Sequence, residues 1–267
     1  MLASLRADLE MARRGYARYA AYPGAAAAGI FTNTVFGFMR AFILLALYQQ
    51  RETVGGYDAS AAVTYVWVGQ ALLMTVFMWG WLDIAVRIRT GDIATDLVRP
   101  IHPLRAALGF DLGRAAYHIV FRGIPPFVVG MAFFPVRLPS EIAVWIAFLV
   151  SLVLAVVVSF FFRVLYNVVG FWTTDVRGTM MLGGIIANLF SGFLIPVSFF
   201  PDWLAAIARA TPFPSIVQTP IDIFVGTVSG PAIVGALVTQ IAWAIALGLA
   251  ARWTFDLGVR RLVVQGG

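Results

Sequence analysis

The sequence predicts an all-α protein that crosses a membrane several times, and three observations support this fold class. Hydrophobic residues make up 61% of the 267 residues, charged residues make up only 12%, and the mean hydropathy is +0.87. Soluble domains carry about 25% charged residues, so this chain cannot cover its surface with polar groups. Its apolar residues also gather in runs of about 20, the length at which a helix crosses the hydrocarbon core of a bilayer.

Six apolar runs are long enough to span. The third contains Pro125–Pro126, which predicts a kink or a break, and the fifth ends near Pro196. The predicted spans are Gly24–Tyr48, Ala59–Leu82, Leu108–Phe134, Glu141–Leu165, Thr179–Phe199 and Pro231–Trp253.

Two further segments complete the predicted architecture. Residues 1–23 carry four arginines among leucines and tyrosines, a pattern that predicts an amphipathic helix lying in the headgroup plane. Residues 24–267 then form one six-helix transmembrane domain. Its connection 196–230 contains five prolines yet is too apolar for a solvated loop. It predicts a proline-broken outer helical hairpin between spans five and six, partly re-entrant or lying on the outer leaflet.

Arginine counts predict the orientation, because cytoplasmic loops carry an excess of basic residues. With the N-terminus in the cytoplasm, 13 arginines fall in cytoplasmic segments and only Arg51, Arg137 and Arg209 fall on the opposite side. Both termini are therefore expected in the cytoplasm. The arginines follow the ends of apolar runs rather than one basic face, which argues against nucleic acid as a partner. The predicted cytoplasmic segments are 1–23, 83–107, 163–178 and 252–267.

The segment Asp83–Arg105 is a charged loop between the second and third spans. Lipid cannot satisfy its charges or its irregular backbone, so it lies outside the hydrocarbon, where a soluble partner can reach it. All 19 basic residues of the chain are arginine. A P-loop needs a lysine on the phosphates, so we expect any energy from ATP to come from another polypeptide.

Residues suited to catalysis or metal binding are few. The chain has no cysteine, and His102 and His118 lack an HExxH-type partner, so no metal site is expected. His118 is interpreted as a packed helix residue. Asp92 and Asp96 have a spacing that could hold a divalent metal against a phosphate, but the arginines on both flanks favour internal ion pairing instead.

Two arginines, Arg40 and Arg122, lie within the predicted first and third spans. An arginine facing lipid is costly, so each is expected to face protein, water or headgroups. One interpretation is contact with an anionic substrate or lipid headgroup. The favoured one is pairing with Glu141, Asp202 or Asp222 near the outer ends of other helices. Asn33 and Asn188 are expected to form interhelical hydrogen bonds.

Five sequence stretches together resemble the permease subunits of type-2 ABC exporters, and in particular the small bacterial permeases encoded in pairs beside one ATPase. The resemblance covers nearly the whole chain. The stretches are GDIATDLVRPIHP (Gly91–Pro103), FWTTDVRG (Phe171–Gly178), FSGFLIPVSFFPDWL (Phe190–Leu204), TPFPSIVQTPIDIFVG (Thr211–Gly226) and RRLVVQGG (Arg260–Gly267).

This resemblance implies a subunit in a bacterial plasma (inner) membrane that pairs with a second permease, identical or related, and exports cargo through their interface. It implies no cofactor in this chain, since partner ATPase subunits bind ATP and Mg²⁺. Cytoplasmic loops would contact the ATPase, and the broken outer helices would cap the route. The implied coupling residues are Arg87, Arg89, Gly91, Asp92, Asp96, Arg99, Asp175 and Arg177, and the implied outer gate is Pro196, Phe199, Phe200, Pro201 and Trp203.

Two other classes of function compete with this one. A membrane-embedded enzyme acting on phospholipids or polyprenyl phosphates would use Asp92, Asp96 and Arg99 on a metal and a phosphate, but it would be expected to carry a denser acid cluster. An autonomous channel or secondary carrier would favour acids within the spans or an inverted repeat, and the predicted spans are read as lacking both. The cargo is not specified by the sequence, although the aromatic-rich interior suits hydrophobic or amphiphilic molecules.

Overall fold

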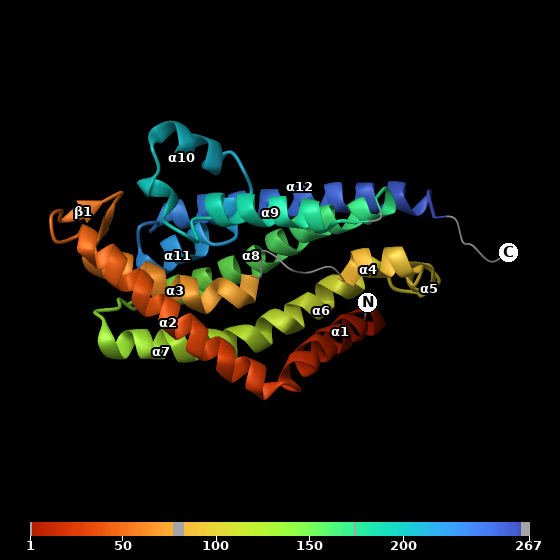
Figure 1. Cartoon of the computed structure of the whole chain (residues 1–267), viewed down its shortest axis with the longest axis horizontal. Helices are drawn as coiled ribbons and strands as arrows, with labels where there is room; N and C mark the ends of the chain where they lie inside the picture. Colours follow the sequence, from red (N-terminus) through yellow and green to blue (C-terminus); the bar gives the residue numbers. More distant parts are fainter. Residues whose placement is uncertain (1, 77–82, 174, 263–267) are drawn as a thin grey trace.

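The computed structural model of the chain describes residues 2–76, 83–173 and 175–262. Most of these residues are helical (Figure 1), which confirms the all-α class. Within the described ranges, five helical stretches are long and apolar enough to cross a bilayer. They are α2 (Pro23–Leu47), α3 (Ala59–Val76), α6 with α7 (Pro103–Phe133), α8 with the 3₁₀ turn η2 (Ile142–Phe171) and α12 (Pro231–Val259).

The fifth predicted span is not one continuous helix. The helix α9 (Arg177–Phe190) has 14 residues and reaches about 21 Å at 1.5 Å per residue, short of the roughly 30 Å core. Gly192 turns the chain after α9 with a φ of 83°, a conformation that favours glycine. The count of six spans stays a prediction. The end of the second predicted span, residues 77–82, lies outside the described residues.

The third span passes its two prolines without a break. The helix α6 (Pro103–His118) continues through the π-helical segment η1 (Ile119–Gly123) into α7 (Ile124–Phe133). Pro125 and Pro126 lack an N–H, so the carbonyls four residues earlier lose their usual α-helical donors. The wider π-helical turn contains those carbonyls, and such turns are a known way to relieve this mismatch.

Helix α3 occupies the centre of the bundle. It contacts α2, α6, α7, α8 and α11, and its residues from 61 to 72 are buried throughout. Helices α2 and α12 instead expose large apolar side chains, among them Phe31, Ile43 and Trp253. An apolar exterior around a packed centre is the pattern expected of helices that face lipid.

Helix α1 (Leu2–Ala20) forms where the amphipathic helix was predicted, and it packs along α6. Their backbones meet at glycines: a Cβ on Gly113 would lie 1.8 Å from the Ala12 carbonyl oxygen, and one on Gly15 would lie 2.0 Å from the Phe110 oxygen. Small residues permit such close helix contacts. The headgroup-plane position remains a prediction, because Tyr16, Tyr19 and the glycine face contact the protein itself.

The elements at the two ends of the bundle are short. The start of α1, α4 (Asp83–Thr90), α5 (Ile93–Leu97) and the end of α12 lie at one end of the molecule, and the hairpin of β1 (Thr53–Val54) and β2 (Tyr57–Asp58) lies at the other with α10 (Figure 1). This sidedness agrees with the predicted loop assignment. The hairpin itself was not predicted, although its Gly55–Gly56 turn has positive φ at both residues, 57° and 87°, as a type I′ turn requires.

The connection after α9 consists of short helices, as predicted. A proline directly precedes η3, α10 and η4, and Pro220 lies in the first turn of α11, where no N–H is needed. The helix α10 is peripheral, whereas α11 packs between α3 and α8. The segments are η3 (Val197–Phe199), α10 (Asp202–Arg209), η4 (Phe213–Ser215) and α11 (Gln218–Val225).

Candidate partner-docking site

The charged loop folds as two short helices joined by a glycine turn. Helix α4 ends at Thr90, and Gly91, with a φ of 83°, reverses the chain before α5. The carboxylate of Asp96 lies 2.5 Å from Arg87 Nε and 3.5 Å from an Arg99 guanidinium nitrogen. Thr90 donates a hydrogen bond of 2.7 Å to Asp92. The internal ion pairing expected from the sequence is confirmed for Asp96, which therefore holds the loop together.

A second polar segment follows η2. Arg177 donates from its backbone N–H and from Nε to the Asp175 carboxylate, at 2.9 Å in each case, and Thr173 donates to the Asp175 carbonyl. The Arg177 side chain and backbone lower the pKa of Asp175 to about 2, with Arg89 adding a smaller attraction. Asp175 is thus ionised at any physiological pH, and Arg177 is held in place without being buried.

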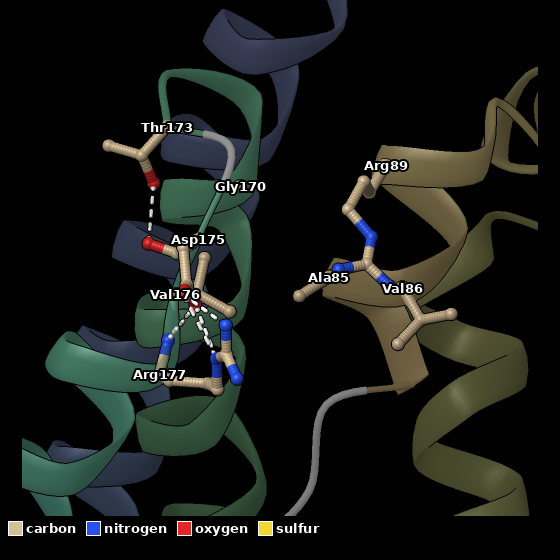
Figure 2. A pocket seen from close by; sticks show the side chains of 8 residues that line it. All are labelled: Ala85, Val86, Arg89, Gly170, Thr173, Asp175, Val176 and Arg177. Atoms are coloured by element: carbon tan, nitrogen blue, oxygen red, sulfur yellow. Dashed lines mark hydrogen bonds and ion pairs between the residues drawn. The ribbon is translucent and has the colours of Figure 1, made fainter.

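These two segments form opposite walls of one pocket of about 290 Å³. Figure 2 shows Arg89 on α4 facing the Asp175–Arg177 pair across the opening. Two arginines and one aspartate give the pocket a net positive charge. The lining consists of Ala85, Val86, Arg89, Gly170, Thr173, Asp175, Val176 and Arg177. Three of the predicted coupling residues, Arg89, Asp175 and Arg177, therefore come together, and the other five lie along the adjoining loop.

Exposed apolar side chains lie in this pocket, beside it, and on the adjoining loop. Val98, just after α5, is 84% exposed, and Val86 and Trp172 are each 42% exposed. Water is an unfavourable environment for such groups. Because they lie among charged residues at the end of the molecule, this surface has the mixed apolar and polar character of a protein interface.

Beneath the loop lies a buried cluster of charged residues that was not predicted from the sequence. Arg163 on α8 donates to both oxygens of Asp111 on α6, at 2.6 and 3.2 Å, and Arg114 donates to Asp111 at 2.7 Å. All three side chains are at most 3% exposed. The expectation that the spans lack acids is wrong at Asp111. Arg163 was counted among the cytoplasmic arginines, and moving it inside leaves twelve against three, so the predicted orientation is unchanged.

Hydrogen bonds also connect the cluster to α3 and to α4. Arg114 donates to the carbonyls of Met74 and Thr75, at 2.5 and 2.9 Å, and Ser159 donates to the carbonyl of Val76. These carbonyl oxygens carry partial negative charge, so α3 helps to balance the second arginine. One turn after Arg163, Asn167 accepts a hydrogen bond from the Ala85 N–H at 3.1 Å. Helix α4, which forms one wall of the pocket, is thereby attached to the buried cluster.

The two arginines predicted within spans do not form the expected acid pairs. Arg40 donates to the carbonyls of Phe193 and Leu194 and stacks over the Phe193 ring, so it holds the turn after α9. The guanidinium of Arg122 lies against Gly29, where a Cβ would come within 2.0 Å of it. In the part of the chain that the structure describes, neither arginine pairs with Glu141, Asp202 or Asp222. Backbone carbonyls take the place of an acid at Arg40, and Arg122 packs against helix α2 instead.

The other polar residues singled out from the sequence have mixed outcomes. Asn33 donates to the Gln70 carbonyl across α2 and α3, and His118 is 2% exposed, as expected. Asn188 is different, because its amide donates to Gly184 within its own helix. His102 caps α6 by accepting from the Leu104 N–H, and burial, followed by the nearby Arg252, lowers the pKa of its imidazole. It is therefore neutral at pH 7.

The predicted outer-gate residues do not share one face. Phe199 packs on the hairpin through the Tyr57 ring, with ring centres 5.9 Å apart. Phe200 is buried under α10 with Ala205 and Ala208, whereas Trp203 is 66% exposed. Pro196 and Pro201 precede η3 and α10. In the described part of the chain no three His, Asp or Glu residues form a group that could hold a metal ion.

The comparison with protein families identifies the class of protein. The model of the ABC-2 family transporter proteins matches residues 35–266. The chain belongs to this family and is a permease component of an ABC transporter, a membrane protein of a family that generally works with separate ATP-binding subunits. No curated protein and no solved structure matches the chain.

Proposed function

We propose that this chain is the membrane-spanning subunit of an ATP-driven exporter, and that partner ATPase subunits dock on the pocket between α4 and the 172–177 segment. One observation carries the proposal: two sequence segments that the family resemblance implicates in coupling, about 90 residues apart, form the two walls of a single pocket. ATP and Mg²⁺ would bind to the partner, since this chain has no lysine for a P-loop.

The geometry suggests how force would reach the spans. A partner that moves α4 pulls on the Ala85–Asn167 hydrogen bond, and through it on α8 and the buried Asp111 cluster. Buried, fully bonded networks resist local deformation, so motion of the loop is passed on as motion of whole helices. On this proposal the loop is a rigid lever rather than a flexible tether, because Asp96 ties α5 back to α4.

The rest of the transport model extends the family resemblance. Two permease subunits, identical or related, would form the route at their interface. The termini, α4 and α5 would face the cytoplasm of a bacterial cell, as the arginine counts indicate. The outer connection, with exposed Trp203 on α10, would cap the route on the far side. An apolar, lipid-like cargo fits the aromatic-rich spans.

Charge reversal in the pocket tests the docking site. The full chain, affinity-tagged in its native host and purified in mild detergent, is expected to bring with it a stoichiometric P-loop ATPase, detected by mass spectrometry. In the double variant Arg89→Glu, Arg177→Glu, ATPase recovery should fall by about tenfold or more, since 1.4 kcal/mol of lost binding energy is a factor of ten.

The matched control is Arg51→Glu, an exposed arginine beside the hairpin at the opposite end of the molecule. It should retain wild-type ATPase recovery. Normal ATPase recovery with the double variant would contradict the docking site. Absence of any ATPase with the wild-type chain in several detergents would contradict the coupled-exporter function itself.

A further inference from the structure

A second pocket, of about 240 Å³, lies at the end of the molecule opposite α4 and α5, between the hairpin and the connection that contains α10 and α11 (Figure 1). Its lining is mostly polar, which is unusual in a chain that is 61% hydrophobic. The lining residues are Gly55, Tyr57, Val197, Ser198, Arg209, Pro214, Gln218, Thr219, Asp222, Thr227 and Val228.

Asp222 is the acid of this pocket, and its bonded partners are neutral. The Gln218 amide donates to both carboxylate oxygens, at 3.0 and 2.9 Å, and the Tyr57 hydroxyl donates to one of them. The Thr227 side chain also stabilises the charged carboxylate, and it too is neutral. No ion pair to Asp222 is present among the described residues. A cationic donor that enters the pocket would therefore find an uncompensated negative charge.

The neighbours of Asp222 hold it in a fixed orientation. The carbonyl oxygen of the Gln218 side chain accepts from the Tyr65 hydroxyl at 2.7 Å and from the Val197 N–H at 2.9 Å. This sets the amide so that its N–H groups point at Asp222 and at the Tyr57 hydroxyl. Gln218 is 7% exposed and Tyr57 is 1% exposed. The carboxylate is therefore preorganised before any ligand arrives, which lowers the cost of binding.

A positive group lies on the same pocket. Arg209, at the end of α10, lines the opening, is exposed, and attracts the Asp222 carboxylate only weakly. The Ser198 hydroxyl oxygen is buried and has no hydrogen-bond partner in the described ranges. One wall thus presents an acceptor for a cation, and another presents a guanidinium and a hydroxyl suited to an anion.

We propose that this pocket binds a small zwitterion of the phosphoethanolamine type, with its primary ammonium on Asp222 and Tyr57 and its anionic group on Arg209 and Ser198. The volume equals about eight water molecules at 30 Å³ each, which suits a headgroup and is below the roughly 300 Å³ minimum of drug-sized sites. A metal ion is disfavoured, because Ca²⁺ needs six to eight oxygen ligands and Asp222 is the only acid of the lining.

The same chemistry occurs in a free small molecule and in a phosphatidylethanolamine headgroup. Two probes distinguish these sources. Soluble phosphoethanolamine is titrated calorimetrically into the full chain in detergent, with phosphocholine as the comparison, because its trimethylammonium group cannot donate hydrogen bonds. Separately, the chain in phosphatidylcholine nanodiscs with or without phosphatidylethanolamine is examined by native mass spectrometry for retained lipid.

The variants are Asp222→Asn and Arg209→Gln, with Asp202→Asn as matched control, since Asp202 is an exposed acid outside the pocket on the same connection. We expect the ethanolamine probe to bind at least about tenfold more tightly than the choline probe, and each pocket variant to lose about tenfold while the control binds as the wild type does. If Asp222→Asn does not accumulate in the membrane, the same loss of affinity is measured with Arg209→Gln and Tyr57→Phe instead.

Binding of the soluble probe assigns the site to a free ligand, and retention of the lipid alone assigns it to the bilayer. The proposal is overturned if neither probe is preferred over its choline counterpart, or if the pocket variants bind as the wild type does. This site does not depend on the ATPase-docking proposal. ATPase recovery should be unchanged in Asp222→Asn, so the two can fail separately.

The pH dependence provides a second readout. Burial raises the pKa of the Asp222 carboxyl, and among the described residues Tyr57 on β2, Tyr65 on α3 and Arg209 on α10 are the titratable or charged groups that interact with it. Burial also raises the pKa of the Tyr57 hydroxyl, which stays protonated. As the pH falls through the pKa of Asp222, the carboxylate becomes neutral, so ammonium affinity should fall on the acid side in the wild type but not in Asp222→Asn.

Discussion

Charged residues at the loop end of this molecule fall into two groups that differ in burial. In the cluster of Asp111, Arg114 and Arg163, the side chains are at most 3% exposed, and α3, α6 and α8 each contribute a hydrogen-bonding group. In the pair of Asp175 and Arg177, the side chains are 52% and 77% exposed. The buried group therefore acts on helix packing, while the exposed group is free to meet a partner.

The difference follows from the solvent around each charge. An ion pair in water gains little, because water screens it and the side chains lose freedom. A buried pair costs several kcal/mol of desolvation per ion, and this cost is balanced only while both partners stay in place. The same types of residue thus have opposite sensitivities to mutation.

The largest expected effect is the loss of the buried acid. Asp111→Asn keeps the side-chain shape but leaves two buried guanidinium groups without their counter-charge, so it should lower the free energy of unfolding by about 3–5 kcal/mol. The readouts are the amount of chain in the membrane fraction and the thermal midpoint in detergent. Adding Arg163→Gln should recover part of the loss. A single variant as stable as the wild type would break the proposed contrast between buried and exposed charge.

A smaller effect is expected at the link between cluster and loop. Asn167→Leu removes the acceptor for the Ala85 N–H, and an unsatisfied buried donor costs about 1–3 kcal/mol. Helix α4 should exchange its amide hydrogens faster, and ATPase recovery should fall at unchanged expression. Asn188→Leu is the matched control, because that amide donates only within its own helix. Equal exchange in α4 for both variants would show that Asn167 does not position the loop.

Much of the fold follows from local sequence patterns. Apolar run lengths predict the long helices, and the spacing of prolines predicts the short helices after α9. Each of these features depends on a few adjacent residues. The hairpin and the end of α9 also had local signals, Gly55–Gly56 and Gly192, but glycine has several roles and their positive φ values become visible only in the structure.

The buried cluster could not be predicted from short stretches of sequence, because its residues are far apart along the chain. Asp111 and Arg163 are 52 residues apart, and each lies at the border of an apolar run, where a charge ordinarily marks a loop. The available signal was Arg114, three residues after Asp111 and on the same helix face. A charged pair facing one way within an apolar helix indicates a buried partner. The two walls of the pocket between α4 and the 172–177 segment were predicted as separate segments, and only the tertiary structure brings them together.

The smallest expected effect concerns the exposed pair of Asp175 and Arg177, and it tests whether exposed charges contribute less to stability than the buried cluster does. The depressed pKa of Asp175, about 2, means that its stabilising contribution is present above the unfolded pKa of about 3.9 and is lost as the pH falls toward 2. Because both side chains are exposed, that contribution is screened. Asp175→Asn should therefore have the wild-type thermal midpoint between pH 5 and pH 8. Any difference should disappear in stronger acid, and a large destabilisation at pH 7 would mean that this pair, like the buried one, holds helices together.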